Sequence, residues 1–391
     1  MKSLALLWLS GGALRVSVLA VPPLLAFIIA DLNLSGTEVG ILNGIPVALF
    51  AIAAVPGSLL IARVGAVPAL IIGLLIAAIG SALRGVAPGT LTLFVVTAVM
   101  AAGIAVMQPA MPPVVHQWMP HRIGFATAVY SNGLLSGEII AVAITIPIIL
   151  PLVGGDWRGA LIFWSLPNVL IALAVYLRKP PMTDDAIYEG RAWIPDWRDP
   201  VLWKVGLMLS GSTQLYFCVN GFLPSLLLAR DDVEMVAPAL TALNGGQVPA
   251  SLLLLVMASR WERKRWPPLA ASVLALISVL GIVFSSGWWT VAFAALSGFS
   301  AAFLLTLVLA LPPLLVASAD VSRMSAGVFA IGYSAAMIVS VLSGFTWDTT
   351  GLADFSFLPI AVGALPTIFA TLLIDLSKRP AQHMPANKLT L

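Results

Sequence analysis

The sequence predicts an all-α membrane protein with twelve transmembrane helices arranged as two six-helix repeats. Of its 391 residues, 60% are hydrophobic and only 9% are charged, whereas an average soluble domain carries about 25% charged residues. Apolar runs long enough to cross a hydrocarbon core of roughly 30 Å recur along the whole chain. Short matching stretches also recur at an offset of about 200 residues, which indicates an internal duplication.

The candidate spans are separated by polar and Gly/Pro-rich stretches. The first span continues well past the roughly 7–15 apolar residues of a secretory signal and has no convincing small-residue cleavage site, so we interpret it as a retained helix. The single cysteine, Cys218, lies inside a span, which excludes a disulfide framework and a cysteine-based metal site. The spans are approximately 4–32, 35–62, 67–87, 91–115, 123–150, 157–177, 201–228, 235–258, 268–286, 288–317, 324–346 and 353–377.

The basic residues predict the orientation of the chain. With the N-terminus in the cytoplasm, 16 of the 20 Lys and Arg residues fall on the cytoplasmic side, while Arg84, Arg158 and Arg230 fall outside. Because positive residues favour cytoplasmic loops, we expect a multi-pass protein of the cell inner (cytoplasmic) membrane with both termini in the cytoplasm. This distribution accounts for the basic composition without a nucleic-acid partner.

The two halves of the chain match each other in three places. The matching pairs occur in the same order in both halves, so we expect an N-terminal six-helix bundle over 1–177, a cytoplasmic linker over 178–200, and a C-terminal six-helix bundle with a short cytoplasmic tail over 201–391. The pairs are "PPLL" (Pro22–Leu25) with "LPSLL" (Leu223–Leu227), "LNG" (Leu42–Gly44) with "LNG" (Leu243–Gly245), and "MPPVV" (Met111–Val115) with "LPPLL" (Leu311–Leu315).

Longer motifs point to one transporter family. The loop after the second span reads "LLIARVGAV", with Arg63 and Gly65 where the major facilitator superfamily carries Asp-Arg-x-Gly, and with Ala62 in place of the acid. Five further motifs, taken together, resemble the cyanate transporter and 2-nitroimidazole exporter family within that superfamily. The further motifs are "ALRVSVLAVPPLL", "PHRIGFATAVYSNGLLSG" (Pro120–Gly137), "GFLPSLLLARD" (Gly221–Asp231) and "RMSAGVFAIGYSAA" (Arg323–Ala336), followed by "DTTG" (Asp348–Gly351).

The resemblance implies a major facilitator fold and a small-molecule substrate bound between the halves near the midplane. It also implies that spans one, four, seven and ten line the cavity, that Arg15 belongs to the central site, and that Arg63 and Gly65 form a gating loop. Where the family tends to have polar residues in spans ten and eleven, this chain has "GFSAAF" (Gly298–Phe303) and Phe329. The C-terminal half of the site is therefore more apolar, and we expect a substrate larger than cyanate.

Arg15 is the one basic residue predicted inside the membrane. At 1.5 Å per residue it lies about 16 Å along the helix from Leu4, close to the midplane. A guanidinium there costs at least about 2.5–3.5 kcal/mol on insertion scales, so it should face a wet cavity or a partner. We interpret it as an anion clamp, because its planar fork presents paired donors. The alternative is a structural ion pair.

Glu138 is the only acid predicted at a comparable depth. It follows Gly133 and Gly137, a GxxxG pair that lets another helix approach closely. Burial raises the pKa of a carboxyl group and a nearby arginine lowers it, so one interpretation is a proton carrier that exchanges contact with Arg15. The alternatives are a permanently protonated acid bonded to the backbone, or a static partner of Arg15.

Three uncharged polar residues are the further candidates for substrate binding. Gln108 lies in span four, and Tyr216 and Asn220 lie in span seven, which are cavity-lining spans in the fold that the chain resembles. The alternative is that these side chains hold helices together, at about 0.6 kcal/mol each.

The same sequence argues against other classes of protein. It contains no H-E-x-x-H, Walker A or G-x-G-x-x-G motif, and we expect no catalytic residues, metal or cofactor. A membrane-embedded enzyme or a channel suits the duplicated pattern less well than a carrier. We predict a monomeric secondary active transporter that moves a small organic anion or polar heterocyclic solute by alternating access, with proton symport as one mode. The close alternative is an exporter of nitroheterocyclic or other drug-like compounds.

Overall fold

The computed structural model describes residues 2–34, 36–178, 192–261 and 263–376, so most of the predicted linker 178–200 lies outside the described residues. Each of the first six predicted spans corresponds to one helix or to two or three consecutive helical segments. The helices of this half are α1 (Lys2–Leu19), α2 (Val21–Leu32), α3 (Gly36–Ile52), α4 (Ala54–Val64), α5 (Ala66–Arg84), α6 (Thr90–Trp118), α7 (Ile123–Ile144), the π-helical turn η1 (Thr145–Ile149), α8 (Leu150–Leu152), α9 (Trp157–Phe163) and α10 (Leu166–Arg178).

The last six predicted spans are likewise matched in order. The C-terminal half contains α11 (Pro200–Ala229), α12 (Val233–Gly245), α13 (Gln247–Trp261), α14 (Trp266–Phe284), α15 (Trp288–Leu309), α16 (Pro312–Leu315), α17 (Val321–Thr350), the 3₁₀ turn η2 (Ala353–Phe357) and α18 (Leu358–Leu373).

Among the described residues, ten helical segments are long and apolar enough to cross a membrane, and the bent pair formed by α3 and α4, which turns by 53°, supplies an eleventh. The remaining predicted span is α11, which is 30 residues long but carries four polar residues close together near its middle: Ser210, Ser212, Thr213 and Gln214. These polar residues lower the hydropathy of α11. Tyr216 and Phe217 of the same helix contact Arg15 of the other half.

Glycines let α1 and α7 pack backbone against backbone, as the GxxxG pair predicts. A Cβ atom on Gly137 would lie only 2.5 Å from the carbonyl oxygen of Gly12, and one on Gly133 would overlap the carbonyl oxygen of Trp8. This close contact places two charged side chains, Arg15 of α1 and Glu138 of α7, in one region of the protein interior.

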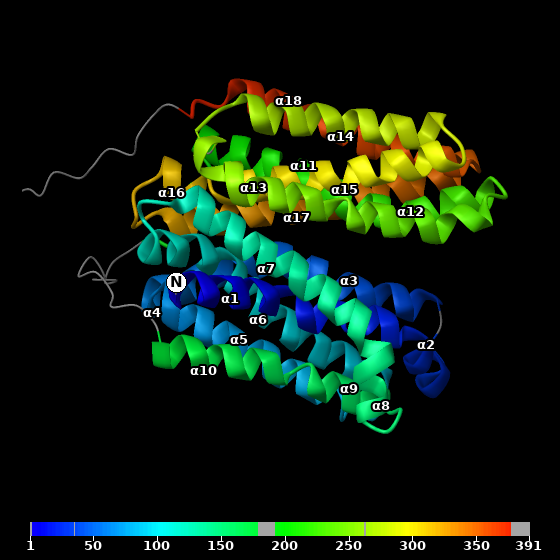
Figure 1. The fold of residues 1–391 in the computed structure, drawn as a ribbon, viewed down its shortest axis with the longest axis horizontal. Coiled ribbons are helices and arrows are strands. Elements are labelled where there is room, and N and C mark those ends of the chain that lie inside the picture. The colour runs from blue at the N-terminus through cyan, green and yellow to red at the C-terminus, as the bar shows by residue number, and fades with distance from the viewer. Residues whose placement is uncertain (1, 35, 179–191, 262, 377–391) are drawn as a thin grey trace, which may run out of the picture.

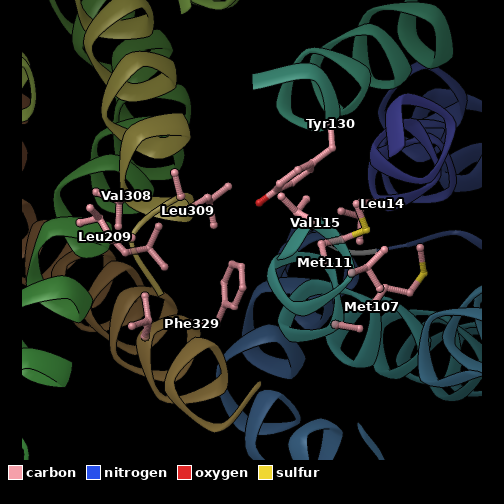
Figure 2. Packing of buried hydrophobic residues seen from close by; sticks show 14 of the residues in the cluster. Leu14, Met107, Met111, Val115, Tyr130, Leu209, Val308, Leu309 and Phe329 are labelled. Carbon is pink, nitrogen blue, oxygen red and sulfur yellow. The ribbon is translucent and has the colours of Figure 1, made fainter. Parts of the chain in front are cut away.

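The two halves share a hydrophobic core at one end of the molecule only. The N-terminus, α4 and α16 lie at that end, which we call the closed end, while α2, α9 and α12 lie at the opposite, far end (Figure 1). A single cluster of buried residues at the closed end contains residues of both halves, such as Met107 and Leu209 (Figure 2). Toward the far end, the described residues form one cluster within each half.

Asn132 of α7 adds a polar link between the halves. Its side-chain oxygen accepts a hydrogen bond from Trp8 Nε1 at 2.9 Å, and its Nδ2 donates to Ser251 Oγ of α13 at 2.9 Å. One amide therefore joins α1 and α7 of the first half to α13 of the second.

The glycine contact predicts a position-specific loss of stability. Gly133→Ala should lower the Tm of the detergent-solubilised protein by a few degrees, because its methyl group meets a backbone atom that cannot move without separating α1 from α7, and such overpacking typically costs about 1–3 kcal/mol. Gly221→Ala in α11 is the matched control, since a Cβ atom there meets nothing within 4 Å. Alanine is favoured over glycine in a helix, so the control should keep or raise the Tm. Equal shifts for the two variants would contradict the packing argument.

Candidate functional site

Arg15 lies in the protein interior without a hydrogen bond or ion pair to any described residue. The residue is 8% exposed, and its guanidinium carbon lies 5.9 Å from the ring centres of both Tyr216 and Phe217. These two rings come from α11 in the other half of the chain. Cation–π contact of this kind stabilises a buried cation by about 0.5–2 kcal/mol, and it leaves the donors of the fork free for a ligand.

Glu138 also contacts α11, through a different atom of the same tyrosine. The hydroxyl of Tyr216 donates a hydrogen bond to Glu138 Oε1. Glu138 is 6% exposed and is close enough to Arg15 for electrostatic attraction. No ion pair within 4.0 Å joins the two charges among the described residues. The static Arg15–Glu138 ion pair that we weighed from the sequence is therefore not formed here, and Tyr216 contacts both charged groups instead.

A first small cavity lies beside Arg15, between α1, α6, α7, α15 and α17. It has a volume of about 20 Å³ and is lined by Gln108 and Tyr130 among others. Gln108 Oε1 and the Tyr130 hydroxyl are both buried without a hydrogen-bond partner. Figure 2 shows the Tyr130 hydroxyl pointing away from α7 toward Leu309 of the other half. Unpartnered buried polar atoms are rare in folded proteins, so this cavity presents two polar atoms that a ligand or water can satisfy.

A second cavity of about 20 Å³, also lined by Arg15, lies mostly against the C-terminal half. Its polar lining includes Ser212, Thr213 and Tyr216 of α11 together with Gln247 of α13. Gln247 begins α13 directly after the break at Gly246. Gln247 was not among the residues predicted to bind substrate. It lies just after the repeated "LNG" motif at Leu243–Gly245, which could have pointed to this position.

The wall of the site in the C-terminal half is aromatic. The Tyr333 ring of α17 lies 5.3 Å from Phe50, 6.1 Å from Phe217 and 6.1 Å from Phe329, measured between ring centres. Phe329 stacks on Tyr333 with an angle of 14° between the ring planes. Phe329, which occupies a position where the related family tends to be polar, thus helps build a wall suited to a flat apolar surface.

Asn220 does not line the three cavities around Arg15. Its Nδ2 donates to the carbonyl of Tyr216 at 2.8 Å, and its Oδ1 accepts from Asn244 of α12 at 3.1 Å. Asn244 in turn accepts from Gln247 at 3.4 Å. In this conformation, the structure therefore favours the alternative interpretation of Asn220, a side chain that holds helices together.

The predicted gating loop lies at the closed end, between α4 and α5. Gly65 joins the two helices with φ +93°, a conformation that an L side chain rarely adopts. Arg63 lies in the last turn of α4 and is exposed. The structure thus accounts for Gly65 through backbone geometry and leaves Arg63 available at the surface of the closed end.

Arg84 was predicted near the end of the span 67–87, on the outer side of the membrane, and its outer location stays a prediction. It is the last residue of α5, but its side chain turns inward and is only 1% exposed. It lines a third cavity, of about 130 Å³, that Arg15 also lines. Nothing local in the sequence shows that its side chain points into the bundle.

The helices of the two halves meet around a buried arginine, an arrangement typical of transporters built from two repeats. The sequence profile of the Major Facilitator Superfamily matches residues 7–243. The chain belongs to this superfamily, as its motifs predicted. Its members are transporters, so the activity of the chain is transport and not catalysis.

Two transporters of Escherichia coli (strain K12) are similar over nearly the whole chain. The 2-nitroimidazole transporter is 26% identical over 360 residues, which cover 90% of each chain. The cyanate transport protein CynX is 25% identical over 370 residues, which cover 93% of this chain and 95% of that one. An uncharacterized transporter of Bacillus subtilis (strain 168), YycB, is 23% identical over 362 residues and 89% of each chain. The predicted family resemblance is confirmed.

Solved structures confirm the predicted fold. The major facilitator transporter FucP in its outward conformation has a TM-score of 0.76 at 16% identity, covering 95% of this chain and 99% of that chain. The proton:xylose symporter XylE bound to 6-bromo-6-deoxy-D-glucose has a TM-score of 0.72 at 14% identity, covering 95% of this chain and 94% of that chain.

The hydrogen bond between the halves predicts unequal effects for two tyrosines. Tyr216→Phe keeps the ring beside Arg15 but leaves Glu138 without its donor, which typically costs about 1–3 kcal/mol for a buried group. We expect a lower Tm for the empty protein. Tyr130→Phe is the matched control, because its hydroxyl has no partner, and it should keep or raise the Tm. If the two variants melt alike, the Tyr216–Glu138 contact does not stabilise this conformation.

Proposed function

We propose that the chain carries a small, planar organic anion or polar heterocyclic solute across the cytoplasmic membrane by alternating access, with Arg15 as the group that binds it. The observation that supports this most directly is a buried guanidinium that contacts two aromatic rings but has no hydrogen bond or ion pair to a described residue. Intramembrane charges without a structural partner mark substrate pathways.

Carboxylates and nitro groups present the same geometry to Arg15. Each is planar and carries two oxygens on one atom, and a guanidinium donates two parallel hydrogen bonds to such a pair. The stacked rings of Phe329 and Tyr333 provide a flat wall for the rest of the solute. Export of nitroheterocycles is therefore the second candidate, and it is favoured by that wall and by the relative named as a 2-nitroimidazole transporter.

Alternating access fits the distribution of contacts between the halves. One shared core and the Asn132–Ser251 hydrogen bond close one end, while each half has its own core toward the other end. With the orientation expected from the basic residues, the closed end is cytoplasmic and the conformation is outward-facing. The halves would then rock about the region of Arg15, separating α4 and α16 from their partners as the far end closes.

Glu138 is the proposed proton site. Its carboxylate accepts from Tyr216 of the other half and attracts Arg15, so it helps balance the positive charge while the site is empty. When an anion binds, its charge compensates that of Arg15, so the charge of Glu138 becomes surplus. Protonation of Glu138 then removes this surplus negative charge. Anion and proton would cross together, with Tyr216 free to reorient because the neutral acid no longer holds its hydroxyl as strongly.

Arg15→Lys tests the proposed recognition. The variant keeps the charge but loses the planar fork, so binding should weaken by about tenfold or more if two parallel hydrogen bonds are made. The measurement is thermal stabilisation of the purified full chain by benzoate and by 2-nitroimidazole, since a ligand of the folded state raises its Tm. Parent-like binding by Arg15→Lys would rule out the clamp. Stabilisation by 2-nitroimidazole alone would favour the exporter over the anion carrier.

Glu138→Gln tests the coupling. Glutamine resembles the protonated acid, so the variant should retain binding and exchange of labelled probe across proteoliposomes. It should lose accumulation driven by a proton gradient, because it has no proton to release. If Glu138→Gln still accumulates the probe against its gradient when a proton gradient is applied, the coupling role is wrong.

A further inference from the structure

Of three cavities that Arg15 lines, the largest lies mainly in the N-terminal half. It lies between α1, α2, α3, α5 and α6, and a single residue of the C-terminal half, Phe217, completes it. Its volume is about 130 Å³, against about 20 Å³ for each of the other two cavities. A cavity of about 150 Å³ holds benzene, and one water needs about 10–15 Å³. Of the three, this cavity comes nearest to the size of an organic ring.

Arg84 brings a second cation to this cavity, and its side chain is anchored. Its terminal nitrogen Nη2 donates to the carbonyl of Ser17 at 2.7 Å and to Ser81 Oγ at 3.0 Å. Its Nε is buried and has no hydrogen-bond partner. No ion pair among the described residues involves Arg84. The guanidinium is thus held in a fixed orientation with unused donor capacity and an uncompensated charge.

Thr97 of α6 contributes a neutral polar group to the same cavity. It is 1% exposed, and its hydroxyl has no hydrogen-bond partner. No acidic side chain is among the residues that line the cavity, and the rest of the lining is apolar, including Val47, Phe50 and Met100. Two cations, an unpaired hydroxyl and apolar walls are the combination expected for an organic anion with a hydrophobic body.

We propose that this cavity is a second binding position for a single-ring organic anion, held in the N-terminal half by Arg84 and Thr97. The anionic group accepts hydrogen bonds from the Thr97 hydroxyl and the free edge of Arg84, and the ring lies against Phe50 and Met100. This proposal rests on the proposed function and specifies its substrate class. Because Arg15 lines this cavity and both smaller ones, the anion can pass from Arg84 to Arg15 without losing contact with a positive charge.

Thr97→Val is the sharpest test, because it keeps the shape of the side chain and breaks no hydrogen bond in the empty protein. We expect it to weaken binding of benzoate, the probe, by about tenfold, which corresponds to one hydrogen bond to a charged group. Thr127→Val is the matched control: Thr127 is also 1% exposed with an unpartnered hydroxyl, but it lies on α7 away from the cavity lining. The control should bind benzoate as the parent does.

Binding at the second position can be measured apart from binding at Arg15 in a variant that lacks the Arg15 guanidinium. Arg15→Gln should retain weak stabilisation by benzoate, and adding Thr97→Val should remove it. Equal benzoate affinities for the parent and Thr97→Val, or a parent that benzoate does not stabilise at all, would overturn the second position. The proposed function is tested separately, because parent-like binding by Arg15→Lys would rule out the Arg15 clamp. In that case a tenfold loss of benzoate binding in Thr97→Val would still support the second binding position.

Discussion

The organisation of the site follows from the need to keep a guanidinium near the middle of a bilayer. Water is the usual partner of such a charge, and its replacement here comes from both halves: two aromatic rings of α11 and the nearby carboxylate of Glu138. This arrangement stabilises the cation by weak, non-directional contacts and not by a close ion pair. A charge held in this way remains available to a ligand, whereas one in a bidentate salt bridge would first have to lose its partner.

The glycine-mediated contact of α1 with α7 brings Arg15 and Glu138 into one region, and it involves the first half only. Gly12 and Gly137 bring together the two backbones that carry Arg15 and Glu138. Tyr216 belongs to the second half, and it contacts both groups. Movement of α11 therefore changes the surroundings of both charges at once, which links the chemistry of the site to the positions of the bundles.

The sequence predicted the helices well because a bilayer imposes a simple requirement, about 20 apolar residues per span, and every predicted span has its counterpart. It predicted Arg15 and Glu138 for the same reason, since charges stand out in apolar sequence. It did not show that the Arg84 side chain points into the bundle, because a residue at the end of a span can turn outward or inward and only packing decides. The sequence could not tell which polar residues line a cavity and which hold helices together. Gln247 lines a cavity, whereas Asn220 bonds to Asn244. Position along a helix does not show which neighbouring helix a polar side chain meets.

If the closed end opens as proposed, the side chain of Asn132 is placed to ease the separation. It donates to Ser251 across the interface and accepts from Trp8 within its own half. When α13 moves away, the bond to Trp8 can persist and hold the amide in place, while the donor that served Ser251 becomes accessible to entering water. The polar link is then exchanged for hydration at little net cost. In the proposed alternating access, the larger opposing cost would be separation of the shared apolar core, and this hydrogen bond would add little to it.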